Sequence, residues 1–209
     1  MTALRVYVAG PLFDLKQLDG NQRFADAIER HSEGRYKPIL PQLLGASRDP
    51  IAIRNSCLRA LIASDVAVFQ LDGSEPDSGT VVEFMLARML DMPSVLIRTD
   101  FRVGGDQAEA GEPWNLMLSG WPRTASVVRH AMTLWGEGQD AWGRLADDVI
   151  DAFEGVLRET SAIPPADQDA VMARALVSCG MSLLKGAPEG FTVDRLVQTR
   201  RAKGLWLTP

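Results

Sequence analysis

The chain has 209 residues, of which 46% are hydrophobic and 23% are charged, and these values are typical of a globular protein with one sizeable core. A formal net charge of −5 argues against a protein that binds nucleic acids through their phosphates, because such proteins usually present a basic face. Two histidines and two widely separated cysteines offer neither metal-ligand spacing nor a disulfide framework. No apolar run approaches the roughly 20 residues of a membrane span. The N-terminus lacks the pattern of a signal peptide, so we expect a cytoplasmic protein that contacts no membrane.

Strands and helices are predicted to alternate along the first half of the chain. Short β-branched apolar runs predict the strands, and apolar residues at helical spacing predict the helices. In chain order the pattern gives a strand at 4–10, a helix at 17–31, a strand at 36–41, a helix at 49–64, a strand at 65–71, a helix at 80–91 and a strand at 93–98. Such alternation predicts a parallel sheet covered on both faces, built from right-handed βαβ units.

The pattern weakens after residue 98. Residues 99–113 are Gly-rich and acidic and predict a long loop, and "ASVVRHAM" (125–132) favours a last strand. A helix is predicted at 140–158, a linker in "SAIPPAD" (161–167), and two further helices at about 167–184 and 192–202. We therefore divide the chain into an α/β domain, residues 1–160, and a helical C-terminal extension of unknown role, residues 161–209.

Two carboxylates flank a glycine turn directly after the third predicted strand. In "EPDSGTVVEF" (75–84), Asp77 and Ser78 could simply cap the following helix, and Glu83 could be an anion that the helix dipole tolerates. However, Glu83 interrupts an otherwise apolar run. The loop also follows a central strand, and ligands of open α/β sheets bind at the carboxyl ends of such strands. The pattern therefore leaves both a capping and a chemical interpretation open.

The chemical interpretation is glycosyl transfer. A carboxylate near a helix N-terminus is expected to stay ionised at neutral pH, as a nucleophile toward an anomeric carbon requires. Retaining transfer needs a second group that handles the proton of the leaving group, and Asp77 is placed for that role. Tyr7, in the first strand, could orient Glu83 with its phenol or could be an ordinary core tyrosine.

Three motifs, taken together, resemble the nucleoside 2-deoxyribosyltransferase family. They are "VYVAGPLF", "EPDSGTVVEFMLA" and "EPWNLML", and in this order they cover residues 5 to about 120. The resemblance implies a flavodoxin-like, doubly wound parallel sheet. It also implies that Glu83 attacks C1′ of a 2′-deoxynucleoside, that a second nucleobase resolves the covalent intermediate with retention, that Tyr7 positions Glu83, and that Asp77 hydrogen bonds to or protonates the base.

The same resemblance implies how substrate is bound. Asn115 would reach the sugar 5′-hydroxyl from a neighbouring subunit with Met117 beside it, so the enzyme would be a homo-oligomer with shared active sites. Its partners would be small nucleosides and nucleobases of nucleotide salvage, and it would need no cofactor and no metal. The remaining residues expected to bind substrate are Gly10, Pro11, Phe13, Asp72, Ser78, Gly79 and Cys57. Of these, Asp72 stands at a strand end and could instead cap a turn.

Two positions depart from the family pattern. Cys57 stands where family members usually carry Asp or Asn, and Met85 stands where they usually carry Gly, so we expect a more apolar pocket. Two alternatives stay open: an N-glycoside hydrolase of 2′-deoxynucleosides or their 5′-phosphates, and a non-catalytic module that senses nucleosides or nucleotides. In the second, the C-terminal extension would report occupancy. The extension could also cover the sheet, form an oligomer interface, or close the pocket with Trp206.

Overall fold

Five parallel strands form a single sheet in the order β2-β1-β3-β4-β5 in the computed structural model, which describes residues 2–45, 47–102, 113–138 and 140–206. The strands are β1 (Leu4–Ala9), β2 (Tyr36–Ile39), β3 (Val66–Gln70), β4 (Ser94–Arg98) and β5 (Thr124–Val128). Each neighbouring pair is parallel. The strand order reverses between β1 and β3, so the sheet is the doubly wound, flavodoxin-like one that the sequence predicts.

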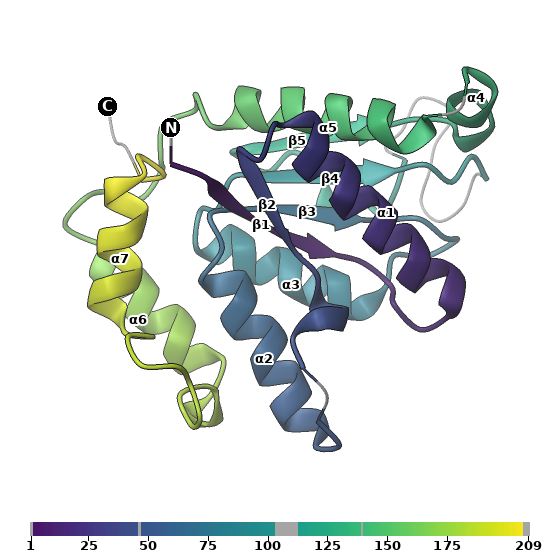
Figure 1. The fold of residues 1–209 in the computed structure, drawn as a ribbon. Coiled ribbons are helices and arrows are strands. Elements are labelled where there is room, and N and C mark those ends of the chain that lie inside the picture. The colour runs from purple at the N-terminus through teal and green to yellow at the C-terminus, as the bar shows by residue number, and fades with distance from the viewer. Residues whose placement is uncertain (1, 46, 103–112, 139, 207–209) are drawn as a thin grey trace.

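Helices cover both faces of this sheet (Figure 1). The helices α1 (Leu15–His31) and α5 (Ala141–Val156) lie on one face, and α2 (Pro50–Ile62) and α3 (Ser78–Met89) lie on the other. The short α4 (Ala131–Gly136) follows β5. An aspartate caps each of the four long helices by accepting a hydrogen bond from a backbone N–H of the first turn. The bounds of α1, α2, α3 and α5 agree with the four helices predicted before residue 160 to within a few residues at each end.

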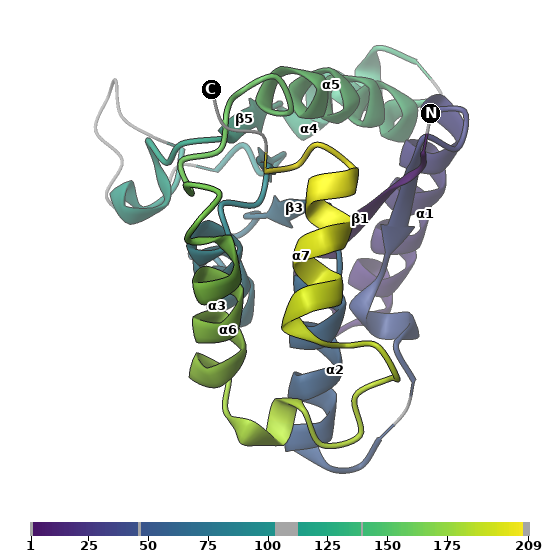
Figure 2. The same cartoon turned by 90° about the vertical axis from the view of Figure 1, so that its left-hand side faces the viewer.

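The C-terminal extension lies against the α2 and α3 side of the molecule. It consists of α6 (Gln168–Ser178), a 3₁₀ turn (Met181–Leu183) and α7 (Val193–Ala202), with α6 beside α3 and α7 beside α2 (Figure 2). The prediction of one helix over 167–184 is wrong, because the chain turns at Gly180, where φ is +93°. An α-helix needs negative φ, so the helix ends before this glycine.

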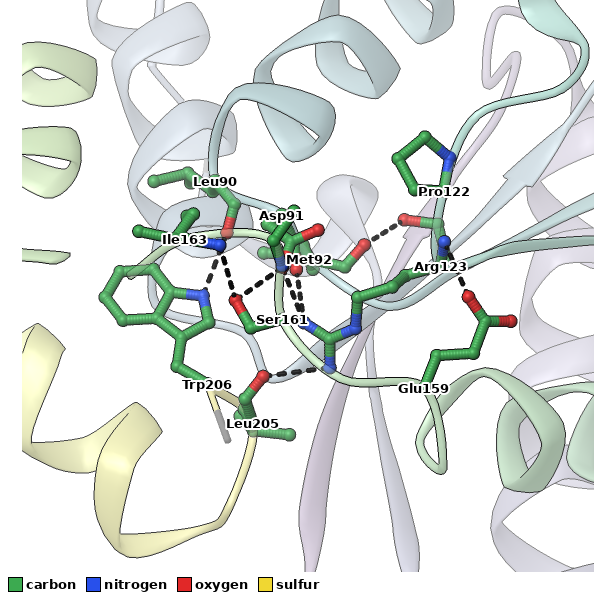
Figure 3. Close-up of polar contacts among 12 residues, drawn as sticks. Leu90, Asp91, Met92, Pro122, Arg123, Glu159, Ser161, Ile163, Leu205 and Trp206 are labelled. Carbon is green, nitrogen blue, oxygen red and sulfur yellow. Dashed lines mark hydrogen bonds and ion pairs between the residues drawn. The ribbon is translucent and has the colours of Figure 1, made fainter. Parts of the chain in front are cut away.

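A buried polar cluster fixes the end of the extension at the edge where the strands begin (Figure 3). Arg123 donates from Nη1 to the Asp91 carboxylate (2.9 Å) and from Nη2 to the carbonyl oxygen of Leu205 (2.9 Å). Ser161 also donates to Asp91, and the Trp206 indole donates to the carbonyl oxygen of Leu90. Trp206 is thus held at the edge of the sheet opposite the carboxyl ends of the strands. It therefore does not close a pocket at the carboxyl ends, which was one of the possibilities for the extension.

Two further predictions are adjusted by the structure. The last strand begins at Thr124 and ends at Val128, so "ASVVRHAM" is strand only in its first half and turns into α4 after His130. The predicted loop at 99–113 falls largely on residues 103–112, which lie outside the described residues. Within the part of the chain that the structure describes, no helix is both long and apolar enough to cross a membrane.

Candidate functional site

A short hydrogen bond joins the two residues that the sequence singles out in β1 and α3. The Tyr7 hydroxyl donates to Oε1 of Glu83 at 2.6 Å. Tyr7 is fully buried because its strand is central in the sheet, whereas Glu83 lies in the second turn of α3 and is partly exposed. The pair therefore connects the interior of the sheet with the helix that begins at its carboxyl edge.

Burial dominates the charge state of Glu83. It raises the pKa of Glu83 to about 7, the hydrogen bond from Tyr7 opposes this rise, and the negative charge of Asp77 adds to it. Glu83 is therefore ionised only in part at neutral pH, because desolvation raises its pKa above that of a solvated carboxyl group. Burial raises the pKa of Tyr7 well above its usual value, and the charge of Glu83 raises it further. The phenol therefore keeps its proton and remains a hydrogen-bond donor.

Cys57 lies in the same cluster. Cys57 belongs to α2 and is partly buried. Burial raises the pKa of its thiol, and the nearby charge of Glu83 raises it further. The thiol also interacts with the Tyr7 hydroxyl. Tyr7, Cys57 and Glu83 thus form one cluster contributed by β1, α2 and α3, as the sequence predicts for residues of one site.

Asp77 is the N-cap of α3 in this structure. Its Oδ2 accepts hydrogen bonds from the backbone N–H of Thr80 (2.8 Å) and from the Thr80 hydroxyl (3.0 Å). A Cβ at position 79 would lie 3.1 Å from this Oδ2, so Gly79 leaves the room that the carboxylate needs. The capping interpretation therefore describes the observed geometry. The charge of Asp77 still acts on Glu83, so the two carboxylates belong to one electrostatic site.

Asn115 and Met117 lie at a cavity beside the start of α3. Asn115 caps the 3₁₀ turn Leu116–Leu118 by accepting from the Met117 N–H at 3.0 Å. Both residues line a cavity of about 470 Å³ together with Ser78 and Val82, at the start of α3. The described residues that line this cavity do not include Glu83 or Tyr7.

Pro11 and Asp72 lie at a second cavity, of about 380 Å³, at the carboxyl ends of β1 and β3 on the side of α1. Asp72 accepts from the backbone N–H groups of Thr99 and Asp100 and from the Thr99 hydroxyl, so it fixes the turn after β4. Gly10 packs against the side chain of Gln70, and Phe13 is 77% exposed on the loop that follows β1. The substrate-binding residues expected from the sequence are therefore distributed over both sides of this edge.

Met85 does not narrow any of these cavities. It is exposed on the outer side of α3 and is absent from the described residues that line them. Within the single chain, Met85 therefore adds no apolar surface to these two cavities. Instead, Met85 continues an exposed apolar stripe on α3 that also contains Val82 and Met89.

Three polar residues that sequence reasoning did not single out organise this edge of the sheet. Gln70 donates to Asn21 at 2.9 Å, and Asn21 donates to the carbonyl oxygen of Pro11, so β3 is tied to α1 and to the loop after β1. Arg98 is buried and donates to the carbonyl oxygens of Leu71 and Gly73, around Asp72. Gln70 and Arg98 each end an apolar strand, and a polar residue in that position is the signal that could have identified them.

This arrangement suits chemistry at an electrophilic carbon. A carboxylate with a pKa near neutrality exists in both protonation states at pH 7, and one oxygen of Glu83 is oriented by a donor that cannot easily lose its proton. Asp77 supplies a second carboxylate at the helix N-terminus.

Comparison with known proteins identifies the family. A sequence model of the family described as nucleoside 2-deoxyribosyltransferase matches residues 6–117, just over half of the chain. None of the curated proteins that were compared matches the sequence. Among solved structures, a conserved protein from Enterococcus faecalis V583 is 22% identical over 74% of this chain and 99% of its own, with a TM-score of 0.53, and this likeness supports the fold.

Two more distant structures are also similar. A 2-desoxiribosyltransferase from Leishmania mexicana is 25% identical over 56% of this chain and 86% of its own, with a TM-score of 0.47. The CMP N-glycosidase BcmB from Clostridium botulinum is 12% identical over 70% of this chain and 98% of its own, with a TM-score of 0.43. These two likenesses are too weak to bear on the reaction, and the family match rests on the sequence. The chain belongs to the nucleoside 2-deoxyribosyltransferase family, whose members are enzymes that act on nucleosides.

Proposed function

We propose that this protein transfers the 2-deoxyribosyl group between nucleobases, with retention, through a covalent intermediate on Glu83. The observation that carries the proposal is the 2.6 Å hydrogen bond from Tyr7 to Glu83, in a member of this family and at the ligand-binding edge of the sheet. The bond orients one carboxylate oxygen and leaves the other to attack.

The proposed steps use two carboxylates. In the reactive form Glu83 is ionised and Asp77 carries a proton. An oxygen of Glu83 attacks C1′ as the C1′–N bond breaks, and the electron pair of that bond goes to the base nitrogen, which takes the proton and leaves Asp77 ionised. A second base then attacks C1′ through its ring nitrogen, the ester bond to Glu83 breaks, and the proton of the second base returns to Asp77. Asp77 must turn away from Thr80 to do this, which costs the helix cap.

The substrate site is proposed to be completed by a second subunit. Asn115 and Met117 line a cavity at the start of α3 whose described lining does not include Glu83, and Met117 is 75% exposed. Exposed apolar side chains of α3 surround the same region, as a surface that another copy covers would require. In the complete site, Asn115 binds the sugar 5′-hydroxyl, and Cys57, Asp72, Ser78 and the loop Gly10–Phe13 contact the substrate.

Product analysis tests the reaction. The protein is incubated with deoxyinosine and adenine, and separately with deoxyinosine alone, and the products are separated by chromatography. Deoxyadenosine formed only in the first mixture is the expected result. Hypoxanthine released equally in both mixtures would identify a hydrolase, and no turnover of purine or pyrimidine deoxynucleosides would indicate a sensing module. Glu83→Gln removes the nucleophile. Glu29→Gln, which replaces an exposed glutamate of α1, is the matched control.

Mixing two inactive variants tests the shared site. Glu83→Ala and Asn115→Ala are each expected to be inactive, yet a hybrid oligomer contains one site with both native residues if Asn115 acts on the neighbouring subunit. Activity that appears after co-expression of the two chains supports the proposal. Continued inactivity of verified hybrid oligomers would show that Asn115 acts within its own chain or not at all.

A further inference from the structure

A cavity of about 230 Å³ lies between the C-terminal extension and the edge where the strands begin. Its walls come from β1, from the turn between α2 and β3, and from residues 188–200 of the extension. The volume is below the roughly 300–1,000 Å³ that is typical of sites for drug-sized ligands. The cavity is therefore of a size for a small molecule or ion, and it lies at the opposite edge of the sheet from Glu83.

Three arginines line this cavity, and each has hydrogen-bond donors to spare. Arg200 is 2% exposed, and its Nη2 donates to the carbonyl oxygens of Ile62 and Ser64, both at 3.1 Å. Its Nη1 is buried without a hydrogen-bond partner among the described residues. The side chains of Arg5 and Arg195 have no hydrogen bond or ion pair within the described part of the chain.

The charges that face the cavity do not balance. Asp65 is already engaged, since it accepts from Lys203 (2.6 Å) and from the backbone N–H of Arg5 (2.7 Å). Glu189 is the remaining carboxylate among the described lining residues. Burial lowers the pKa of Arg200 only to about 10, so its guanidinium group stays positively charged at neutral pH, as is general for arginine. Three positive charges against one negative charge leave a surplus of two.

We infer that this cavity is a binding site for a phosphate dianion, either free or as a phosphomonoester. A charge of −2 matches the surplus, and guanidinium groups match the geometry of phosphate oxygens with paired N–H donors. An anion held in the cavity would also lie beside the positive charge of Arg200, which lines the cavity and whose Nη1 has no hydrogen-bond partner among the described residues. The anion joins α7, through Arg195 and Arg200, to β1, through Arg5.

Thermal unfolding and calorimetric titration of the full-length protein test this inference. Inorganic phosphate and deoxyribose 5-phosphate are the two probes, and sodium chloride keeps the ionic strength constant. A ligand that binds only the folded state raises Tm as its concentration rises. Arg5→Gln and Arg195→Gln are each expected to weaken binding at least about tenfold, as the loss of one charge-assisted contact predicts. Both replacements are at exposed side chains, so folding is preserved.

Arg174→Gln is the matched control, because Arg174 is an exposed arginine of α6 that does not line the cavity. Phosphate also stabilises proteins nonspecifically, and that effect is shared by the control. Tighter binding of deoxyribose 5-phosphate than of phosphate would identify a phosphomonoester as the ligand, and the reverse would identify free phosphate. An equal response of all variants, or no saturable binding of either probe, would overturn the inference. The result is independent of the proposed reaction, because the replaced residues do not belong to the Glu83 site; binding of deoxyribose 5-phosphate that Arg5→Gln and Arg195→Gln leave unchanged would be binding at another site and would not support the inference.

Discussion

At the scale of single residues, the charge of Glu83 is set by two opposing influences. Burial raises its pKa to about 7, and the hydrogen bond from Tyr7 acts against this rise. Since the nucleophile must be ionised, the acid limb of the kcat/KM profile is expected to rise with pH through about 7. The Tyr7 hydroxyl stabilises the ionised form, so its removal raises the pKa of Glu83 further.

Tyr7→Phe is therefore expected to move the acid limb of the kcat/KM profile to higher pH by about one unit, and to lower activity most below pH 7. The measurement is a pH–rate profile of the two proteins. Tyr36→Phe is a matched control, because Tyr36 is also buried and donates to a glutamate, Glu154, but lies in the core on the other face. An unchanged limb in Tyr7→Phe would show that the hydrogen bond does not set the charge of Glu83.

Asp77 combines a structural and a chemical role, and Asn separates them. Asparagine is as good an N-cap as aspartate, so Asp77→Asn preserves the start of α3. It removes the proton carrier, and kcat/KM is expected to fall by about 10²–10⁴-fold, the usual contribution of general acid–base catalysis. It also removes the negative charge that raises the pKa of Glu83, so the acid limb moves to lower pH.

Steady-state rates and Tm of this variant decide between the two roles. Thr80→Val removes one of the two hydrogen bonds to Asp77 without removing its charge, and so serves as the control. A small loss of activity in Asp77→Asn, similar to that of the control, would reduce Asp77 to a helix cap.

At the scale of elements, a buried ion pair connects the loop after α3 with the start of β5. Asp91 and Arg123 are 2.9 Å apart, and their side chains are 7% and 2% exposed. Asp91→Asn leaves the Arg123 charge buried without its counter-ion, which is expected to cost about 3–5 kcal/mol in the free energy of unfolding. Asparagine also tolerates the positive φ of 47° at this position, so backbone strain adds little.

Urea unfolding measures this cost. Asp19→Asn breaks an ion pair of similar length in α1, between side chains that are 57% and 63% exposed, and is expected to cost less than about 1 kcal/mol. Equal effects of the two replacements would contradict the view that the buried pair secures the loops at this edge of the sheet.

At the scale of the whole molecule, the parts predicted well from the sequence are those with local signals. The strands of the sheet are short apolar runs bounded by turns, and the position of Glu83 beside Tyr7 follows from the strand order together with the family motifs. The charge state of Glu83 was not predictable, because desolvation depends on how deeply the folded chain buries the group.

The docking of the C-terminal extension could not be predicted from the sequence. Its helices are visible in the sequence, but their docking depends on contacts between residues distant along the chain. Arg123 and Leu205 are one example, and Asn55 and Ser182 are another. The division at residue 160 stays a prediction, although buried Ser161 and Ile163 already belong to the packed structure.

Trp206 allows the role of the extension to be tested apart from the reaction. Its indole is buried, contributes to the core on the α2 and α3 face, and donates to the Leu90 carbonyl at the edge opposite Glu83. Trp206→Ala is expected to lower the free energy of unfolding by about 3–5 kcal/mol, because it leaves a large cavity. At temperatures well below Tm, kcat and KM are expected to stay unchanged, because Trp206 does not reach the substrate edge.

Trp135→Ala, at a 76% exposed indole, is the control and is expected to alter stability little. A changed KM in Trp206→Ala with unchanged stability would instead indicate that the extension acts on the substrate site.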